Sequence, residues 1–229
     1  MYLGTNNLTG SIPNSIGKLT KLTSLYLHSN QLFGHIPREL GYLQNLEDLY
    51  LSNNTLTGSI QNSIGNLTKL TTLHINNNQL SGNIPRELGY LVNLENMLLG
   101  NNTLTGSIPN RIGNLTELRI LYLRDNQFWG QIPRELGYLV NLDLLVFSNN
   151  TLAGSIPNNL GNLTKLVGLY LDNNQLSGHI SRELGYLVNL EYLSLRNNAL
   201  TGPIPKCIGN LTKLKKLDFG QNQLSGPIP

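Results

Sequence analysis

The sequence predicts a solenoid of the α/β class, built from about ten copies of a 24-residue unit. Glycine recurs at every twenty-fourth position from Gly10 to Gly226, and a second series with the same step runs from Gly17 to Gly209. An asparagine series runs beside them from Asn6 to Asn222. Fixed periods of about 20 to 50 residues are typical of units that cannot bury a core alone and stack on their neighbours. We therefore expect function on a surface shared by several repeats.

Each unit opens on a short strand. In the unit 22–45, Leu25 and Leu27 alternate with polar or aromatic residues, which is the period-two pattern of a half-buried strand. Strands of successive units would stack about 4.8 Å apart, so ten coils make a rod on the order of 45 Å long.

A bend and a return path complete the unit. The amide of Asn30, at the bend, can bond backbone groups of adjacent coils that would otherwise stay unpaired. Ile36 is predicted to point inward, and Leu40, Leu43 and Leu46 continue the apolar lining. We expect the return path to form a short helical or 3₁₀ turn.

The unit matches the leucine-rich repeat signature, L-x-x-L-x-L-x-x-N-x-L. The run Leu-x-Gly-x-Ile-Pro, as in 80–85, resembles the plant-specific class of extracellular leucine-rich repeats along essentially the whole chain, although Gln61 and Ser181 replace the proline in two units. The resemblance implies a right-handed coil with a parallel β-sheet on the concave face and short helical or 3₁₀ turns on the convex side. It also implies an additional short strand near Thr57–Ser59.

The same resemblance implies a non-catalytic recognition scaffold. Its class occurs in receptor-like kinases, receptor-like proteins and polygalacturonase-inhibiting proteins. We expect a peptide or protein ligand on the concave face, as in the ectodomain of a plant receptor-like kinase, and a co-receptor is a candidate second partner. Some peptide-sensing relatives carry an Arg-x-Arg pair on one strand, and the corresponding positions here read 122–124 Tyr-Leu-Arg and 194–196 Ser-Leu-Arg.

Two other functions stay open. One is a secreted inhibitor of cell-wall hydrolases, similar to the polygalacturonase-inhibiting proteins. The other is an ice-binding protein that presents rows of hydroxyl groups along the coil. The candidate rows are Thr57, Thr105 and Thr201 with Ser81, Ser177 and Ser225, interrupted by Phe33, Trp129 and Ala153.

The recognition face is expected in three columns of the concave sheet. In the strand L-x-x-L-x-L-x, the third, fifth and seventh positions project outward, and they vary while the scaffold columns repeat. Free drift of exposed strand positions would give the same variation. The predicted ligand-binding residues are Tyr26, Tyr50, His74, Tyr122, Arg124, Tyr170, Asp172, Tyr192 and Arg196.

Within this set, two groups are predicted. Tyr26, Tyr50, His74 and Tyr122 would form one rigid aromatic stripe that buries area at low entropy cost. The arginines and Asp172 would supply charge in the C-terminal half, and an extended peptide along the groove suits this layout. No enzyme is expected, because His74 has no carboxylate in its own or the adjoining fifth and seventh columns to orient it as a base.

The overall composition excludes several other classes. The net charge is +3 and 13% of residues are charged, which falls short of the clustered Lys and Arg of a nucleic-acid binder. No apolar run reaches the roughly 18 residues that span a bilayer, so this segment is expected to make no membrane contact. Cys207 is the only cysteine, which excludes an internal disulfide and disfavours a thiolate metal site. We expect no metal and no cofactor.

The unbroken period predicts a single leucine-rich repeat domain over residues 1–229. Relatives usually close each end with a paired-cysteine cap, and both caps are expected to be absent here. The start, Met1–Asn6, lacks the basic and apolar regions of a secretory signal.

The family resemblance implies an extracellular or cell-surface protein, and sequons on surface turns agree with this. Duplication of an Asn- and Thr-rich repeat also explains them, since near-identical segments recur every forty-eight residues. One column lies on the return path, so sugars there would leave the concave face free. The eight candidate glycosylation sites are Asn7, Asn53, Asn66, Asn101, Asn114, Asn149, Asn162 and Asn210.

Overall fold

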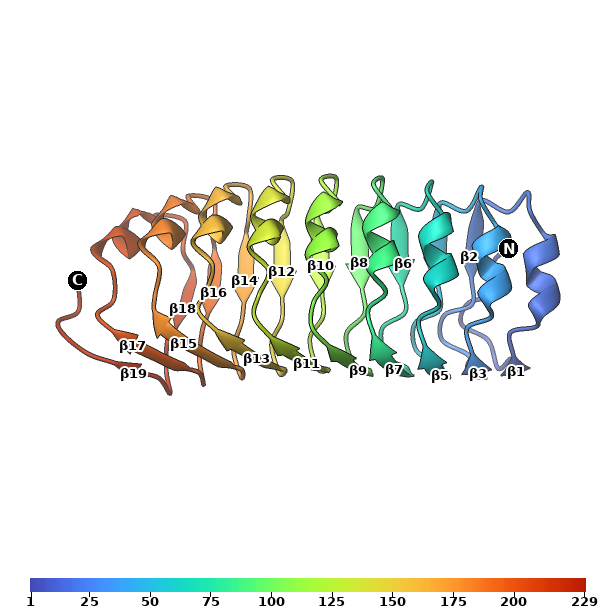
Figure 1. The fold of residues 1–229 in the computed structure, drawn as a ribbon, viewed down its shortest axis with the longest axis horizontal. Coiled ribbons are helices and arrows are strands. Elements are labelled where there is room, and N and C mark those ends of the chain that lie inside the picture. The colour runs from blue at the N-terminus through green and yellow to red at the C-terminus, as the bar shows by residue number, and fades with distance from the viewer.

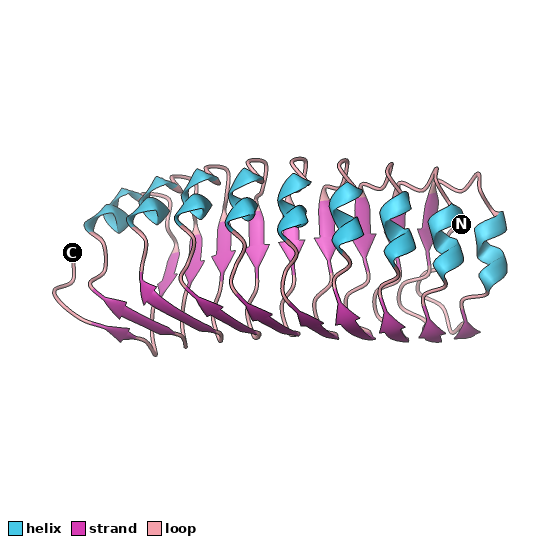
Figure 2. Ribbon diagram, viewed as in Figure 1, coloured by secondary structure: helices cyan, strands magenta, loops and turns pink.

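The computed structural model describes residues 1–229 as one continuous stack of coils, with the two termini at opposite ends (Figure 1). A full coil contributes one strand to each of two parallel sheets and one 3₁₀ helix to the return path. Figure 2 shows the helices side by side along one side of the stack, with the concave strands behind them and the second row of strands along the lower edge. This architecture confirms the predicted leucine-rich repeat solenoid.

The concave sheet has nine strands of three residues, and consecutive coils are paired in strict register. Leu25 pairs with Leu49, and Leu49 with Leu73. Each sequence column therefore becomes a straight row across the sheet. The strands are β2 (Ser24–Tyr26), β4 (Asp48–Tyr50), β6 (Thr72–His74), β8 (Asn96–Leu98), β10 (Ile120–Tyr122), β12 (Leu144–Val146), β14 (Gly168–Tyr170), β16 (Tyr192–Ser194) and β18 (Lys216–Asp218).

A second, lateral sheet of ten strands follows the asparagine bend of each coil. Residues Thr57–Ser59 lie in one of these strands, which confirms the expectation that came from the family resemblance. The strands are β1 (Thr9–Ser11), β3 (Gln31–His35), β5 (Thr55–Ser59), β7 (Gln79–Asn83), β9 (Thr103–Gly106), β11 (Gln127–Gly130), β13 (Thr151–Gly154), β15 (Gln175–His179), β17 (Ala199–Gly202) and β19 (Gln223–Leu224).

Nine 3₁₀ helices form the convex side. Most follow the repeat proline, whose fixed φ suits the residue before a helix. Where Ser181 replaces that proline, its hydroxyl accepts a hydrogen bond from the Glu183 amide at 3.2 Å and so caps the helix. The helices are η1 (Asn14–Lys18), η2 (Arg38–Tyr42), η3 (Asn62–Asn66), η4 (Arg86–Tyr90), η5 (Asn110–Asn114), η6 (Arg134–Tyr138), η7 (Asn158–Asn162), η8 (Arg182–Tyr186) and η9 (Lys206–Asn210).

The core is one apolar cluster of 56 buried residues that runs the length of the stack. Leu25 from the strand and Leu40, Leu43 and Leu46 from the return path are fully buried, and Ile36 is 2% exposed. Burying one such side chain stabilises a fold by about 1.5–3 kcal/mol. The predicted inner lining is confirmed.

The repeat asparagines tie consecutive coils together. The Asn54 side-chain oxygen accepts the Leu32 amide of the preceding coil at 3.0 Å, and its Nδ2 donates to the Leu27 and Leu51 carbonyls at 3.0 and 3.1 Å. Asn150 makes the same set of contacts around Phe128 and Leu123. These bonds satisfy buried backbone groups at the bend, where neither sheet reaches.

Candidate functional site

The structure places all nine predicted ligand-binding residues on the concave face, but in two separate groups. In β2, Leu25 is buried while Ser24 and Tyr26 on either side are partly exposed, and β4, β8, β10 and β16 repeat this alternation. The outward positions therefore form the three predicted columns. Their side chains differ between the N-terminal and C-terminal halves, and each half makes a different surface.

Aromatic rings of the fifth column stack on one another in the N-terminal half. The ring centroids of Tyr26 and Tyr50 lie 4.5 Å apart at 11°, and those of Tyr50 and His74 lie 4.5 Å apart edge to face. Tyr2 extends the row at 4.7 Å from Tyr26. This spacing matches that of adjacent strands, so each ring fills the space above its neighbour. We call Tyr2, Tyr26, Tyr50 and His74 the aromatic stack.

Asp48 anchors the stack from the third column. Its carboxylate accepts hydrogen bonds from the Tyr26 hydroxyl at 3.3 Å and from the Ser24 hydroxyl at 3.1 Å. Burial, followed by the charge of Asp48 and by Tyr50, raises the pKa of Tyr26 to about 12. The Tyr26 phenol therefore stays protonated at neutral pH and remains a donor.

Two histidines complete the packing of the N-terminal half of the concave face. The His28 ring lies 6.0 Å from Tyr26 and 5.9 Å from Tyr50. The buried Nδ1 of His28 and Nε2 of His74 have no hydrogen-bond partner. Burial lowers the pKa of His74, and the charge of Asp48 opposes this only in part. The N-terminal half is thus packed against itself, with these two ring nitrogens closed off from a ligand.

The aromatic stripe is shorter than the sequence predicted. Leu98 of β8 stands between His74 of β6 and Tyr122 of β10, so the row of rings ends at His74. The Tyr122 ring instead lies over Gly100, where an added Cβ would clash with it. Tyr122 therefore belongs to the C-terminal group.

That C-terminal group surrounds an open cleft of about 510 Å³ across β10 to β18, which we call the C-terminal cleft. It brings together five of the predicted residues. The cleft is lined by Tyr122, Arg124, Leu144, Val146, Ser148, Tyr170, Asp172, Ser194, Arg196, Lys216 and Asp218.

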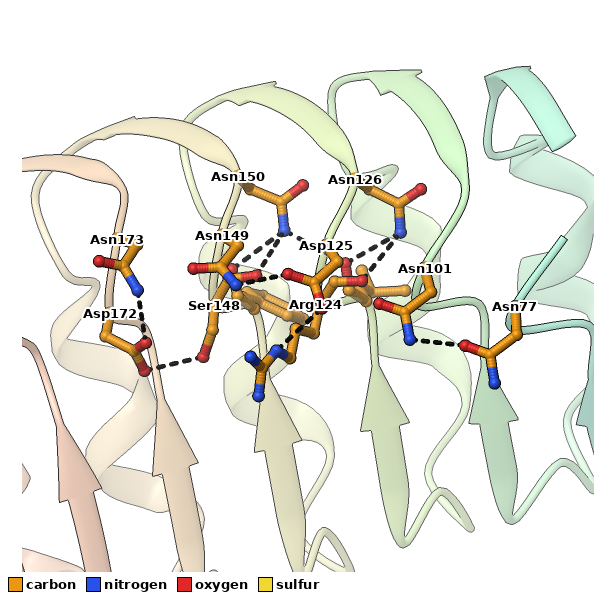
Figure 3. Close-up of polar contacts among 12 residues, drawn as sticks. Asn77, Asn101, Arg124, Asp125, Asn126, Ser148, Asn149, Asn150, Asp172 and Asn173 are labelled. Carbon is orange, nitrogen blue, oxygen red and sulfur yellow. Dashed lines mark hydrogen bonds and ion pairs between the residues drawn. The ribbon is translucent and has the colours of Figure 1, made fainter. Parts of the chain in front are cut away.

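Charges of both signs meet in the cleft. Arg196 lies 3.9 Å from Asp218, and Arg124 and Lys216 also line the cleft. Asp172 accepts hydrogen bonds from the Ser148 hydroxyl at 2.8 Å and from Asn173 at 3.0 Å (Figure 3). Half of the Arg196 side chain is exposed, so a carboxylate ligand could replace the loose contact with Asp218 at small cost.

An apolar hollow of about 460 Å³ adjoins the cleft and shares Leu144 and Tyr170 with it. It contains Tyr192, the sixth predicted residue, whose ring centroid lies 6.5 Å from that of Tyr170. Gly168 borders this hollow and lets the Leu144 and Tyr170 side chains pack over its backbone, because a Cβ there would meet them at 2.7 and 2.9 Å. Apolar and charged subsites thus lie side by side.

The sequence prediction missed half of the cleft lining. Lys216 and Asp218 stand in the same three columns but are not among the predicted ligand-binding residues. Leu144, Val146, Ser148 and Ser194 also lie in these columns, but their small or apolar side chains carry no chemical signal. The small side chains Val146, Ser148 and Ser194, in the columns around Tyr170, were the available signal in the sequence. They leave a space that the larger side chains surround.

A ladder of side chains runs along the carboxyl edge of the concave sheet. Every coil places one residue there in the left-handed conformation, which asparagine tolerates well. Asn77 donates to Asn53 at 2.6 Å, Asn101 donates to Asn77 at 2.5 Å, and Asn149 donates to Asp125 (Figure 3). Arg124 is held against the ladder, 3.0 Å from Asp125. Three predicted glycosylation sites lie in this ladder.

The structure places no group of three His, Cys, Asp or Glu side chains where they could hold a metal ion. Its helices are all too short to cross a bilayer.

Comparisons with known proteins identify the repeats. A family model described as a leucine-rich repeat region matches residues 98–223, and models for two copies and one copy of the repeat match residues 44–85 and 21–43. No curated protein matched the sequence.

Solved structures similar to this chain include two plant receptors and a plant ice-binding protein. The plant peptide hormone receptor RGFR1 in complex with RGF2 is 43% identical with a TM-score of 0.98, over 99% of this chain and 36% of its own. The ectodomain of the plant membrane receptor kinase GASSHO1/SCHENGEN3 from Arabidopsis thaliana, in complex with Casparian strip integrity factor 2, is 37% identical with a TM-score of 0.82, over 98% of this chain and 30% of its own. A plant ice-binding protein is 35% identical with a TM-score of 0.88, over 100% of this chain and 74% of its own.

The chain spans about a third of the length of the two receptor structures. The matched region exceeds half of the chain, and the likeness to the receptor structures extends over almost all of it. The chain belongs to the leucine-rich repeat family, and its repeats are of the plant extracellular class.

Proposed function

We propose that the chain is a non-catalytic recognition scaffold, extracellular or at the cell surface, whose C-terminal cleft binds an extended segment of a peptide or protein ligand. The observation that carries this proposal is the open cleft in one half of a concave face whose other half is filled by its own rings. The two similar receptor structures contain bound ligands, which supports a recognition role.

The dimensions of the cleft suit a short extended peptide. Five strands at about 4.8 Å spacing span roughly 19 Å, the length of about six extended residues. The charged side offers Arg196 and Lys216 to a carboxylate, and the hollow beside Gly168 offers Leu144 and Tyr170 to an apolar side chain. We therefore expect a ligand with an acidic group and an apolar side chain a few residues apart.

A displayed library of random twelve-residue peptides, panned on the purified chain, tests the proposal. The selected peptides should be acidic and apolar, and Arg196→Glu should weaken their binding at least tenfold. Arg134→Glu is the control and should leave binding unchanged, because Arg134 lies on the convex side and is 78% exposed, against 50% for Arg196. Peptides that bind both variants equally well, or no enrichment at all, would contradict the proposed site.

Ice binding is a second candidate, because the similar plant ice-binding protein is matched over most of its own length. The surface in question is the lateral sheet, whose strands line one edge of the stack (Figure 1). Its hydroxyl rows are interrupted by Phe33 and Trp129, which are 54% and 56% exposed. A chain that shapes ice crystals, and loses this effect with Thr105→Tyr in β9, would favour this function. Unchanged crystal habit would remove it.

A further inference from the structure

One column of the convex side alternates between exposed tyrosine and sequon asparagine. It is the last residue of each 3₁₀ helix, and from η2 to η9 tyrosine and asparagine alternate from one coil to the next. The tyrosines are 46–57% exposed, and all four asparagines are exposed. In chain order the column is Tyr42, Asn66, Tyr90, Asn114, Tyr138, Asn162, Tyr186 and Asn210.

The alternation extends to the rest of the sequon. Asn-Leu-Thr in one coil is replaced by Tyr-Leu-Val in the next, so Val92, Val140 and Val188 stand beside the sequon threonines and are 49–50% exposed. We call these half-exposed tyrosines and valines the ridge. A polar sequon coil lies between each apolar pair and the next, so the sequon is the repeating neighbour of the ridge.

Close packing of the helices brings the alternating residues together. From Gly41 to Gly185, the glycine that precedes each column residue lies against the backbone of the next coil, and a Cβ on Gly41 would clash with the Ser63 carbonyl. Consecutive 3₁₀ helices therefore touch. Asn66, Asn114 and Asn162 each have a tyrosine on the coil before and on the coil after, and Asn210 has Tyr186 on the coil before it. A surface hollow of about 590 Å³ already lies at Asn66, bordered by Thr68, Tyr90 and Lys69.

Tyr90 shows how the ring faces are used. The Arg111 guanidinium of the next coil lies 5.4 Å from the ring centroid and donates to the hydroxyl at 3.1 Å. The Arg111 contact therefore covers the part of the Tyr90 ring that faces the coil of Asn114. The ring also borders the hollow at Asn66, so its free surface belongs to the Asn66 site.

The sequons at the concave edge differ from this column. The amides of Asn53, Asn101 and Asn149 donate to the ladder side chains of the preceding coils, which are Ser29, Asn77 and Asp125. Each ladder residue also has a left-handed backbone. A sugar on this edge would crowd the ladder and the nearby Arg124, whereas the convex asparagines take no part in it.

We propose that the convex column is an array of N-glycosylation sites, and that its tyrosines are the platforms on which the first N-acetylglucosamine of each glycan packs. The C–H groups of a pyranose carry partial positive charge and pack on the negative face of an aromatic ring. The glycans would cover the tyrosine and valine ridge on the side opposite the C-terminal cleft, and leave the cleft open.

The modification itself requires a polyprenyl diphosphate-linked oligosaccharide as donor. The asparagine Nδ2 bonds to the anomeric carbon of N-acetylglucosamine, and the bond from that carbon to the diphosphate oxygen breaks. The electron pair leaves with the polyprenyl diphosphate, and one amide proton passes to a base of the transferring enzyme. The threonine two residues on completes the acceptor sequence.

Site mapping tests the array. The chain is secreted from a glycosylating eukaryotic cell behind a signal peptide, and glycopeptides are quantified by mass spectrometry. We expect most molecules to carry sugar at Asn66, Asn114, Asn162 and Asn210, and a smaller fraction at Asn53, Asn101 and Asn149. Empty convex sites would overturn the proposal, and equal occupancy of the two columns would overturn the preference for the convex side.

Thermal unfolding tests the tyrosine platform. The secreted chain is trimmed to one N-acetylglucosamine per site, and Tyr138→Ala is compared with and without Asn114→Gln and Asn162→Gln. We expect Tyr138→Ala to lower Tm about 2 °C more when the sugars are present, and Tyr138→Phe to keep the effect of the ring. Trp129→Ala, similarly exposed on the lateral sheet, should show no such difference. Equal shifts for Tyr138→Ala in both backgrounds would overturn the platform.

Discussion

The two halves of the concave face share one scaffold and differ in how their outward side chains use it. In the N-terminal half, Tyr26, Tyr50 and His74 stack at 4.5 Å and close the surface. In the C-terminal half, the outward side chains include the small residues Val146, Ser148 and Ser194, and these line an open cleft of about 510 Å³. The repeat therefore sets where a side chain projects, and the three variable columns decide whether that surface serves the fold or a ligand.

The largest expected effect tests whether the scaffold is the same in both halves. Asn54 and Asn150 are each 8% exposed and bond the same backbone groups. Replacing either with alanine leaves several buried groups unpaired, so each variant should lose about 3 kcal/mol of the free energy of unfolding. Urea denaturation measures both. A difference of more than about 1 kcal/mol would show that the two scaffolds are not equivalent.

The next effect separates the halves. Tyr50 has a ring on each side at 4.5 Å, whereas Tyr170 has only Tyr192 at 6.5 Å. Tyr50→Ala should therefore destabilise the fold by about 2 kcal/mol and Tyr170→Ala by about 1 kcal/mol. Denaturation of the two variants under the same conditions measures the difference. The reverse order would contradict the closed N-terminal surface.

A smaller, pH-dependent effect is confined to the N-terminal half. Burial lowers the pKa of His74 in the folded chain below its ordinary value of 6.5. Between the two values the unfolded chain binds more protons, so the stability is complete above about pH 6.5 and falls as the pH is lowered. His74→Phe should reduce this loss. Amide hydrogen exchange at pH 5 and 7 measures local opening. Lowering the pH should speed the opening of β4 to β6 more than that of β14 to β16, and an equal change in both regions would contradict the effect of His74.

The smallest expected effect concerns Arg196. Its pair with Asp218 is 3.9 Å long and exposed, so Arg196→Glu should change the free energy of unfolding by less than about 0.5 kcal/mol. Thermal unfolding measures this. A large loss would mean that Arg196 maintains the fold, and its proposed effect on peptide binding could then be indirect.

Much of the fold could be predicted from the sequence, because the period fixes every scaffold residue. Leu25, Ile36 and Asn54 recur at fixed positions, and their burial and bonding follow directly. The second sheet was expected only through the family resemblance, since Thr55–Ser59 has little apolar alternation of its own. The exposed face was also predictable, because period two determines which strand residues point outward.

The grouping of the site residues could not be predicted in the same way. Whether Tyr122 joins Tyr50 depends on Leu98 between them and on the space above Gly100. That outcome follows from how side chains of adjacent coils pack, which the column pattern does not describe. The alternation of Tyr90 with Asn66 and Asn114 was present in the sequence, but its meaning depended on the close contact of consecutive 3₁₀ helices.

Hydrogen exchange with a panned peptide bound tests the division of the concave face most directly. Exchange of backbone amides is measured with and without saturating peptide, so that both halves are observed in the same molecule. We predict protection in β10 to β18 and the bends that follow them, with β2 to β6 unchanged. Protection centred on the aromatic stack, or none on the concave face, would contradict the assignment of the ligand to the C-terminal cleft.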